Sequence, residues 1–217
     1  MGIRIQSEHA NWSDGDRLDG RPLLLLLHGY GGDEHGFDAI SAALSDHFVT
    51  AALRGPRDAS LPGVPSFCWF QVDERVLPLP GQPEESVAAV LDWLDDITAA
   101  RGTPSAIGLL GFSQGAALAL QLLRTEPERW SAVVALAGRW LDLAAAGDER
   151  LTDVRPHVFW GRTEADPLLT PAYVAATRAA LAPFAPDAEH VYPGNVHGVV
   201  PEEFRDVLAF LLVRLSS

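Results

Sequence analysis

Short runs of uniformly hydrophobic residues alternate along this chain with longer segments whose hydrophobic residues recur at helical spacing. The five residues from Leu23 to Leu27 are too few and too uniformly apolar for a one-sided helix, so they predict a buried strand. From Glu84 to Arg101 the apolar residues fall on one helical face and acidic residues occupy the first turn, which is typical of a helix. The other predicted strands are 48–53, 105–112, 131–136, 157–160 and 189–192, and the other predicted helices are 34–46, 114–124, 171–181 and 201–215.

The regular alternation of strands and helices predicts an α/β fold, with a mostly parallel central sheet, helices on both faces and right-handed crossovers. With 217 residues the chain has the size of one ordinary domain, so we expect a single domain over residues 1–217. Asp33 is the expected N-cap of the helix at 34–46. The proline-rich segment 54–81 has no sustained periodicity and predicts an ordered surface excursion, of a length that is often functional.

The charge balance restricts the partners and the chemistry. The chain has 29 acidic and 16 basic residues, a formal charge of -13, and such a surface repels phosphate backbones. We therefore expect no nucleic-acid partner. Every basic residue is an arginine, so mechanisms that need a lysine, such as Schiff-base formation or P-loop phosphate binding, are excluded.

Cysteine usage and the longest apolar run indicate the compartment. Cys68 is the only cysteine, so neither an intramolecular disulfide nor an all-cysteine metal site can form. The N-terminal residues do not read as a secretory signal, and the longest aliphatic run is far shorter than the roughly 20 residues needed to cross a bilayer. We expect a cytoplasmic protein without stable membrane association.

The sharpest local feature is a GxSxG string, Gly111 to Gly115, between a predicted strand and a predicted helix. A serine at a tight strand-to-helix turn adopts a strained backbone, and the glycines two positions away remove the Cβ atoms that would clash. The following helix N-terminus favours the negative charge of an alkoxide at Ser113. Such a string arises by chance in roughly one chain in ten of this size, so the other parts of a catalytic site must also be present.

A base and an orienting acid occur on loops at the predicted carboxyl edge of the sheet. His197 lies between the last strand and the last helix, whereas His190 lies within a strand and is expected to be structural. Asp166 follows the strand at 157–160, and the chain order of Ser113, Asp166 and His197 is that of the α/β-hydrolases. Glu164, on the same loop, is the rival acid.

The remaining parts are an oxyanion hole and a substrate pocket. We expect the backbone N–H groups of Tyr30, in the glycine-rich loop, and of Gln114, next to the nucleophile, to bind the oxyanion. Trp69, Leu168 and Val199 neighbour the predicted catalytic loops and are candidates for lining the acyl pocket.

Other candidate residues favour structural roles. His28 is expected to hydrogen-bond within the glycine-rich loop 28–32, which we call the oxyanion loop. Cys68, which lacks a glycine-flanked turn, is expected to be a buried or pocket-lining thiol. Four residues could be drawn as metal ligands: Asp33, Glu34, His35 and Asp38. Capping residues and acidic first turns are ordinary at the start of a helix, so we expect no metal there.

Four strings together carry a family resemblance: Leu27 to Asp33, Gly111 to Ala116, Asp166-Pro167 and Gly194 to Gly198. The chain resembles the phospholipase/carboxylesterase family of α/β-hydrolases, which includes the acyl-protein thioesterases. The resemblance implies an α/β-hydrolase fold without a large cap domain. It also implies hydrolysis of carboxylic esters or thioesters through an acyl-enzyme, without a cofactor. By this resemblance Ser113 is the nucleophile, His197 the base and Asp166 its orienting acid.

Two departures from the family pattern concern the substrate. Gln71 stands where aspartate is usual, and the acid loop continues from Asp166 as Pro-Leu-Leu-Thr. The leading hypothesis is a carboxylesterase for small to medium acyl chains, acting on a small-molecule ester or thioester. A lysophospholipase or acyl-protein thioesterase is the alternative, and an inactive binding protein on the same scaffold is a remote one. The sequence leaves open the natural substrate and whether the protein forms a homodimer.

Overall fold

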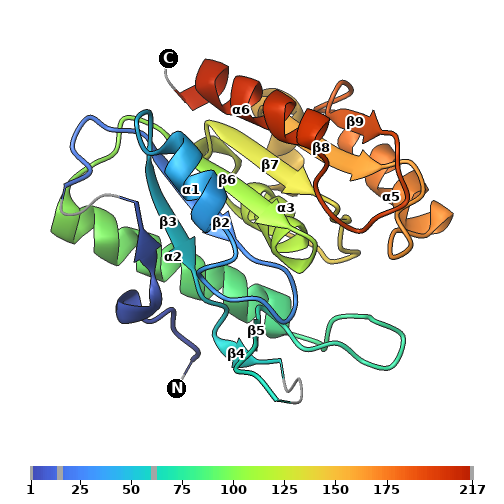
Figure 1. Ribbon diagram of the computed structural model, residues 1–217, viewed down its shortest axis with the longest axis horizontal. Coiled ribbons are helices and arrows are strands. Elements are labelled where there is room, and N and C mark those ends of the chain that lie inside the picture. The colour runs from blue at the N-terminus through green and yellow to red at the C-terminus, as the bar shows by residue number, and fades with distance from the viewer. Residues whose placement is uncertain (1, 14–16, 60–62, 216–217) are drawn as a thin grey trace.

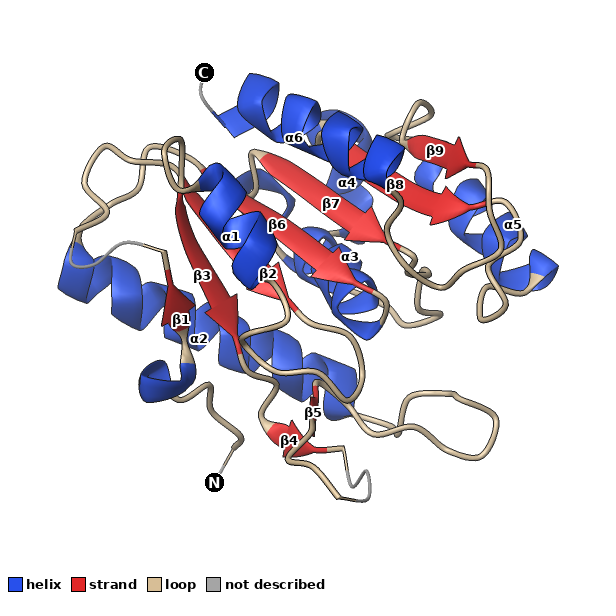
Figure 2. Cartoon of the chain, viewed as in Figure 1, coloured by secondary structure: helices blue, strands red, loops and turns tan. Residues whose placement is uncertain are grey.

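A seven-stranded sheet forms the centre of the protein in a computed structural model that describes residues 2–13, 17–59 and 63–215 (Figures 1 and 2). The strand order is β1-β3-β2-β6-β7-β8-β9, with β1 antiparallel to β3 and every other neighbouring pair parallel. The strands are β1 (Asn11–Trp12), β2 (Leu23–Leu27), β3 (Val49–Leu53), β6 (Ile107–Phe112), β7 (Ala132–Leu136), β8 (Val158–Thr163) and β9 (Glu189–Tyr192).

Helices cover both faces of this sheet, as the alternation of elements predicted. All five leucines of β2 are buried, because alternate side chains of a strand point to opposite faces and both faces here are covered. In Figure 1, α1 (Asp38–Leu44) and α6 (Pro201–Leu215) lie in front of the sheet, and α2 (Gln82–Arg101) and α3 (Gln114–Thr125) lie behind it. The short helix α4 (Leu151–Val154) and α5 (Pro171–Leu181) complete the set, with 3-10 turns at Ser7–His9, Pro127–Arg129 and Asp148–Arg150.

Two hydrophobic cores follow from the two faces. Leu23, Leu25 and Leu27 pack into the core that α2 and α3 cover, whereas Leu24 and Leu26 pack into the core that α1 and α6 cover. Within the described residues no helix is long and apolar enough to span a membrane.

The first helix differs from its predicted bounds. Instead of 34–46, α1 runs only from Asp38 to Leu44, and its N-cap position is Phe37 rather than Asp33. The Asp33 carboxylate accepts a hydrogen bond from the His35 backbone N–H at 2.9 Å, so it stabilises a local turn that competes with helix formation. The Glu34 side chain is buried in an ion pair with Arg54, and this contact stabilises the loop in its non-helical conformation.

The segment 54–81 is an ordered excursion where the structure describes it. It contains a small antiparallel pair, β4 (Arg57–Asp58) with β5 (Phe67–Cys68), and then a hairpin-like loop closed by a bridge between Val72 and Pro78. We call residues 72–78 the excursion loop. Figure 1 shows the excursion projecting beyond the carboxyl ends of the central strands.

Candidate active site

A strained turn presents Ser113 at the carboxyl end of β6. Its φ of +53° and ψ of -112° place a non-glycine residue in a rarely occupied backbone region. A Cβ atom at Gly111 would overlap the Gly115 carbonyl, and one at Gly115 would overlap the carbonyl oxygen of Leu27. Because both obstacles are backbone atoms, the close fit of the turn against α3 and β2 requires glycine at both positions.

His197 and Asp166 complete a hydrogen-bonded chain that starts at Ser113. The His197 Nε2 atom lies 2.8 Å from Ser113 Oγ, and its Nδ1 atom lies 2.8 Å from Asp166 Oδ2 and 3.0 Å from Oδ1. The Asp166 side chain is only 1% exposed, and its Oδ1 also accepts the Leu168 N–H at 2.8 Å. The structure therefore brings together the three residues predicted from loop position and chain order. Glu164, the rival acid, is exposed and does not hydrogen-bond to His197.

Two backbone N–H groups beside Ser113 are free to bind an oxyanion. In the described part of the chain, neither Tyr30 N–H nor Gln114 N–H donates to a protein acceptor, whereas the neighbouring Gly31 N–H donates to Phe67 O. A Cβ atom at Gly29 would lie 3.3 Å from the Ser113 Cβ, so the oxyanion loop lies directly against Ser113. Gln114 is the first residue of α3, where free N–H groups and the helix dipole both favour negative charge.

Buried side chains fix the oxyanion loop. His28 Nε2 accepts the Gly55 N–H at 2.8 Å, so Nδ1 carries the proton and donates to Gly29 O at 2.7 Å. Burial lowers the pKa of His28, which keeps the imidazole neutral in this role. The Trp69 indole N–H donates to His28 O at 2.8 Å, and the Gln114 side chain bonds to Trp69 N and Phe70 O.

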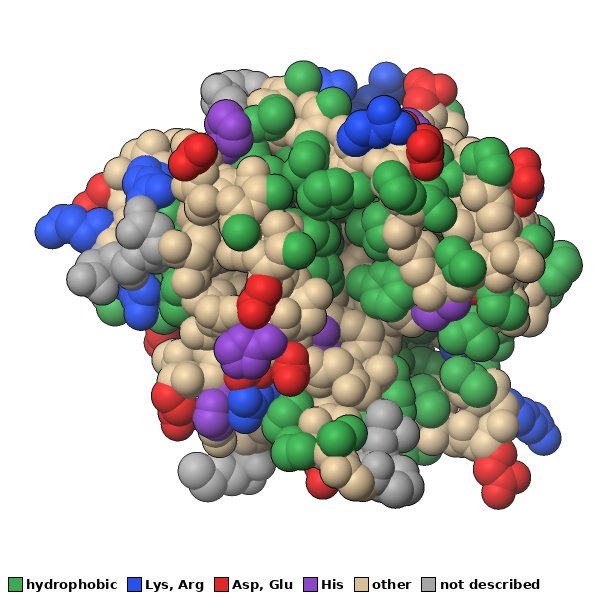
Figure 3. All heavy atoms as spheres, viewed as in Figure 1, with side chains coloured by type: hydrophobic (Ala, Val, Ile, Leu, Met, Phe, Trp, Pro, Cys, Tyr) green, Lys and Arg blue, Asp and Glu red, His purple; other side chains and the backbone are tan. Residues whose placement is uncertain are grey.

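The three residues expected to line the acyl pocket differ in position. The expectation for Trp69 is wrong, because its side chain is fully buried beneath the oxyanion loop and contributes no surface to an open pocket. Leu168 and Val199 are 61% and 37% exposed, next to Asp166 and His197 in the chain. Together with other exposed apolar residues on loops at this edge they form what we call the apolar rim: Tyr30, Val76, Leu77, Leu168, Val196 and Val199. Figure 3 shows hydrophobic side chains over the upper centre and right of this view, and a cluster of acidic, histidine and basic side chains at its lower left.

Cys68 is a buried thiol, which is one of the two positions expected for it. Burial raises its pKa to about 11, so it is overwhelmingly protonated at neutral pH and a poor nucleophile. Each of the four residues considered as metal ligands has another polar partner. Glu34 pairs with Arg54, Asp33 accepts the His35 backbone N–H, and the Asn11 side-chain amide donates to Asp38 and lies 3.4 Å from His35 Nδ1. No group of three His, Cys, Asp or Glu side chains suited to a metal occurs in the ranges that the structure describes.

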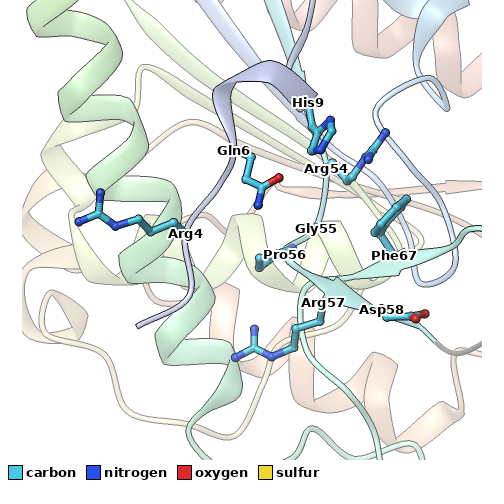
Figure 4. Close-up of a pocket in the computed structure, with 9 residues that line it drawn as sticks. All are labelled: Arg4, Gln6, His9, Arg54, Gly55, Pro56, Arg57, Asp58 and Phe67. Atoms are coloured by element: carbon cyan, nitrogen blue, oxygen red, sulfur yellow. The ribbon is translucent and has the colours of Figure 1, made fainter. Parts of the chain in front are cut away.

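A cavity of about 170 Å³ lies between the N-terminal segment and residues 54–58, and neither Ser113, Asp166 nor His197 lines it (Figure 4). Arginines contribute much of its wall, but Arg54 and Arg57 pair with Glu34 and Glu85. Figure 4 shows the Arg4 guanidinium turned away from the other lining side chains. Because Arg54 and Arg57 are already paired and Arg4 is directed outward, we assign no binding role to this cavity.

Glu203 is a buried carboxyl group beside the site that the sequence analysis missed. It is the third residue of α6 and is fully buried, with Oε2 accepting the Val200 N–H at 3.3 Å. Its Oε1 has no partner among the described residues and lies where a Cβ on Gly161 of β8 would be. Burial, reinforced by the charge of Asp166, raises the pKa of Glu203 to about 7.

Glu203 should therefore make the stability of the protein depend on pH. Its folded-state pKa of about 7 exceeds the ordinary value of 4.5, so the folded protein binds more protons between these values. The free energy of unfolding should fall across this window as pH rises, by on the order of 3 kcal/mol from this group. Urea denaturation at about pH 5 and about pH 8 measures the change.

The matched variants are Glu203→Gln and Glu202→Gln. The first keeps a neutral side chain at every pH and should flatten the slope, so that it is more stable than wild type mainly at the alkaline end. The second removes an exposed first-turn carboxylate, paired with Arg205, and should leave the slope in place. An unchanged slope in Glu203→Gln would show that Glu203 is not the titrating group.

Three features define the α/β-hydrolase class. They are the mostly parallel sheet, the glycine-flanked serine turn after β6, and the acid and histidine that follow β8 and β9. The chain belongs to the Phospholipase/Carboxylesterase family, whose model matches residues 16–215. No cap domain is present in the described ranges.

Known relatives agree with this assignment. The chain is 29% identical over 214 residues to acyl-protein thioesterase 1 of Mycosarcoma maydis, a match that covers 87% of this chain and 89% of that protein. The crystal structure of esterase PE8 superposes with a TM-score of 0.77 at 23% identity, covering 99% of this chain and all of that one (100%). A carboxylesterase from Mesorhizobium loti gives a TM-score of 0.75 at 20% identity, covering 97% and 99% of the two chains. At these identities the two structures show the shared fold.

Proposed function

We propose that this chain is a serine hydrolase that cleaves carboxylic esters with small to medium acyl chains through an acyl-serine intermediate. The observation that carries the proposal is the continuous hydrogen-bonded chain from Ser113 Oγ through His197 to the buried carboxylate of Asp166. Membership of the Phospholipase/Carboxylesterase family supports the same class of reaction.

Acylation uses each group in the position described. Ser113 Oγ attacks the acyl carbonyl carbon as His197 Nε2 accepts the hydroxyl proton. The carbonyl oxygen becomes an oxyanion that accepts hydrogen bonds from the N–H groups of Tyr30 and Gln114, and each such donor contributes roughly 3–4 kcal/mol to the transition state. The C–O bond to the alcohol then breaks, and His197 donates its proton to the leaving oxygen.

Deacylation repeats these steps with water as the nucleophile. His197 accepts a proton from water, the hydroxide attacks the acyl-serine, and the proton returns to Ser113 Oγ as the carboxylic acid leaves. Asp166 accepts the hydrogen bond from His197 Nδ1 in both halves, which fixes the imidazole tautomer and stabilises the imidazolium. The hydrogen bond from Leu168 N–H holds Asp166 in this orientation.

A lysophospholipase or acyl-protein thioesterase activity of the same site is the second candidate. Two observations favour it: the similarity to acyl-protein thioesterase 1 of Mycosarcoma maydis, and the apolar rim, which suits a longer acyl chain. The complete hydrogen-bonded chain at Ser113 argues against an inactive binding protein.

Covalent labelling together with an acyl-chain series tests the proposal. A fluorophosphonate should add to one residue, located at Ser113 by peptide mass spectrometry, because trapping needs a serine activated by a base. Among p-nitrophenyl esters from acetyl to palmitoyl, turnover should be highest for short and medium chains. Turnover that rises through the lauroyl and palmitoyl esters would favour the second candidate, and absence of both adduct and turnover would contradict both.

A further inference from the structure

Arg139 follows β7, the strand next to β6, at the same edge of the sheet as Ser113. Leu136, the last residue of β7, pairs with Phe112 and accepts the Ser113 N–H at 2.8 Å. The chain then turns sharply through Ala137, at a strained φ of +50°. A Cβ atom at Gly138 would lie 3.0 Å from Ser113 O. The backbone of this turn therefore lies close to the backbone of Ser113, and Arg139 is the next residue.

Two elements hold the Arg139 guanidinium in place without neutralising it. Its Nη2 donates to the carbonyl of Val76 in the excursion loop at 2.7 Å, and its Cζ lies 3.9 Å from the centre of the Tyr173 ring of α5. The backbone beside it is anchored as well, because the Trp160 indole N–H donates to Gly138 O at 2.9 Å. Neither the carbonyl nor the ring cancels the positive charge, and the remaining guanidinium N–H groups are available in the plane of the group.

The absence of a carboxylate partner separates Arg139 from many arginines of this acidic chain. Nine other arginines pair with Asp or Glu in the described ranges: Arg17, Arg54, Arg57, Arg124, Arg129, Arg150, Arg162, Arg178 and Arg205. Arg139 is half-buried and forms no ion pair with any described residue. In a chain of net charge -13, a preorganised arginine that keeps its charge at the active-site edge is suited to an anion from outside the protein.

We propose that Arg139 is a specificity-determining residue that binds a carboxylate carried by the substrate, so that the preferred substrates of the Ser113 site are esters that also bear a carboxylate. This inference rests on the proposed ester hydrolysis at Ser113. Val76 and Tyr173 occupy one donor and one face of the guanidinium, and the free edge forms charge-assisted hydrogen bonds with the anion. The apolar rim then contacts the carbon chain between the carboxylate and the scissile ester.

Matched esters that differ only in charge test this inference. On the acyl side, mono-p-nitrophenyl succinate is compared with p-nitrophenyl butyrate, and on the alcohol side, 4-carboxyphenyl butyrate is compared with the neutral amide 4-carbamoylphenyl butyrate. Wild type should show a kcat/KM roughly ten- to hundred-fold higher for the anionic member of at least one pair, as expected for a hydrogen bond to a charged group. Arg139→Met should remove that preference mainly through KM, and Arg139→Lys should keep part of it.

The matched charge control is Arg155→Met. Arg155 lies before β8 at the opposite end of the sheet, is exposed, and its side chain contacts only the Thr152 carbonyl, so the preference should be unchanged. The inference is overturned if wild type shows no preference in either pair. It is also overturned if Arg139→Met lowers kcat/KM equally for the anionic and the neutral ester of a pair. Arg139 would then only hold the excursion loop against α5. In both cases a fluorophosphonate adduct on Ser113 would leave the proposed function standing, whereas loss of adduct and of all turnover would refute both.

Discussion

The Ser113→Ala protein is expected to lose roughly five to six orders of magnitude in kcat on p-nitrophenyl butyrate. Ser113 Oγ is the hydroxyl that His197 Nε2 contacts, and the substitution leaves His197 without a side-chain nucleophile to deprotonate. A residual acceleration of roughly a thousand-fold over water should persist, because the oxyanion N–H groups and substrate binding remain. Release of p-nitrophenol, followed over long times for the variant and at equal concentrations of the two proteins, measures the difference in kcat.

The Ser113→Ala fold should survive, which makes the loss interpretable. Alanine has the same Cβ as serine, so it meets the same backbone strain at φ +53°, and Ser113 makes no side-chain cap bond to α3. Thermal unfolding should therefore resemble that of wild type. Ser45→Ala, which removes an exposed serine hydroxyl bonded to Ala42 O, is the control and should retain full activity. Comparable turnover in Ser113→Ala, with a fluorophosphonate adduct elsewhere, would place the nucleophile on another residue.

The meeting of Ser113, Asp166 and His197 could be predicted because it depends on topology. Each follows a strand of a parallel sheet, and the carboxyl ends of parallel strands share one edge. Hydrophobic runs located β6, β8 and β9 well enough to place all three loops there. The fold class follows from the same alternation of strands and helices.

Features that depend on long-range packing could not be predicted. Trp69 lies in the proline-rich segment 54–81, which has no periodicity, and its buried position is fixed by contacts with His28 and Gln114, far away in the sequence. Glu203 reads as an ordinary exposed acid in a first helical turn. Its burial depends on the space that Gly161 leaves on β8, a relation that exists only after α6 packs on the sheet.

Local competition explains the shorter first helix. The pattern from Glu34 onward is compatible with a helix, but the turn at Asp33 and the ion pair between Glu34 and Arg54 stabilise a loop there instead. Gly32, just before this turn, lies next to His28, since a Cβ added there would be 3.2 Å from the His28 side chain, so the non-helical residues continue the glycine-rich loop.

The Asp166→Asn variant should lose roughly ten-thousand-fold in kcat although it keeps the size and shape of the side chain. Asp166 Oδ1 accepts the Leu168 N–H, so the single oxygen of asparagine should occupy that position. Its NH₂ group then takes the place of Oδ2, 2.8 Å from His197 Nδ1, and donates to it. A histidine that accepts at Nδ1 carries its proton on Nε2, and this tautomer cannot accept the proton of Ser113.

Glu164→Gln supplies the matched control because it makes the same chemical change on the same loop. Glu164 is exposed, and its contact with Tyr192 O uses the backbone N–H, so this variant should retain wild-type kcat. Thermal unfolding of both variants separates catalytic loss from unfolding. If Glu164→Gln instead shows the larger loss, Glu164 is the orienting acid in solution. If both variants remain fully active, a carboxylate is not needed to set the His197 tautomer, and the hydrogen bond to Ser113 must be oriented by the loop alone.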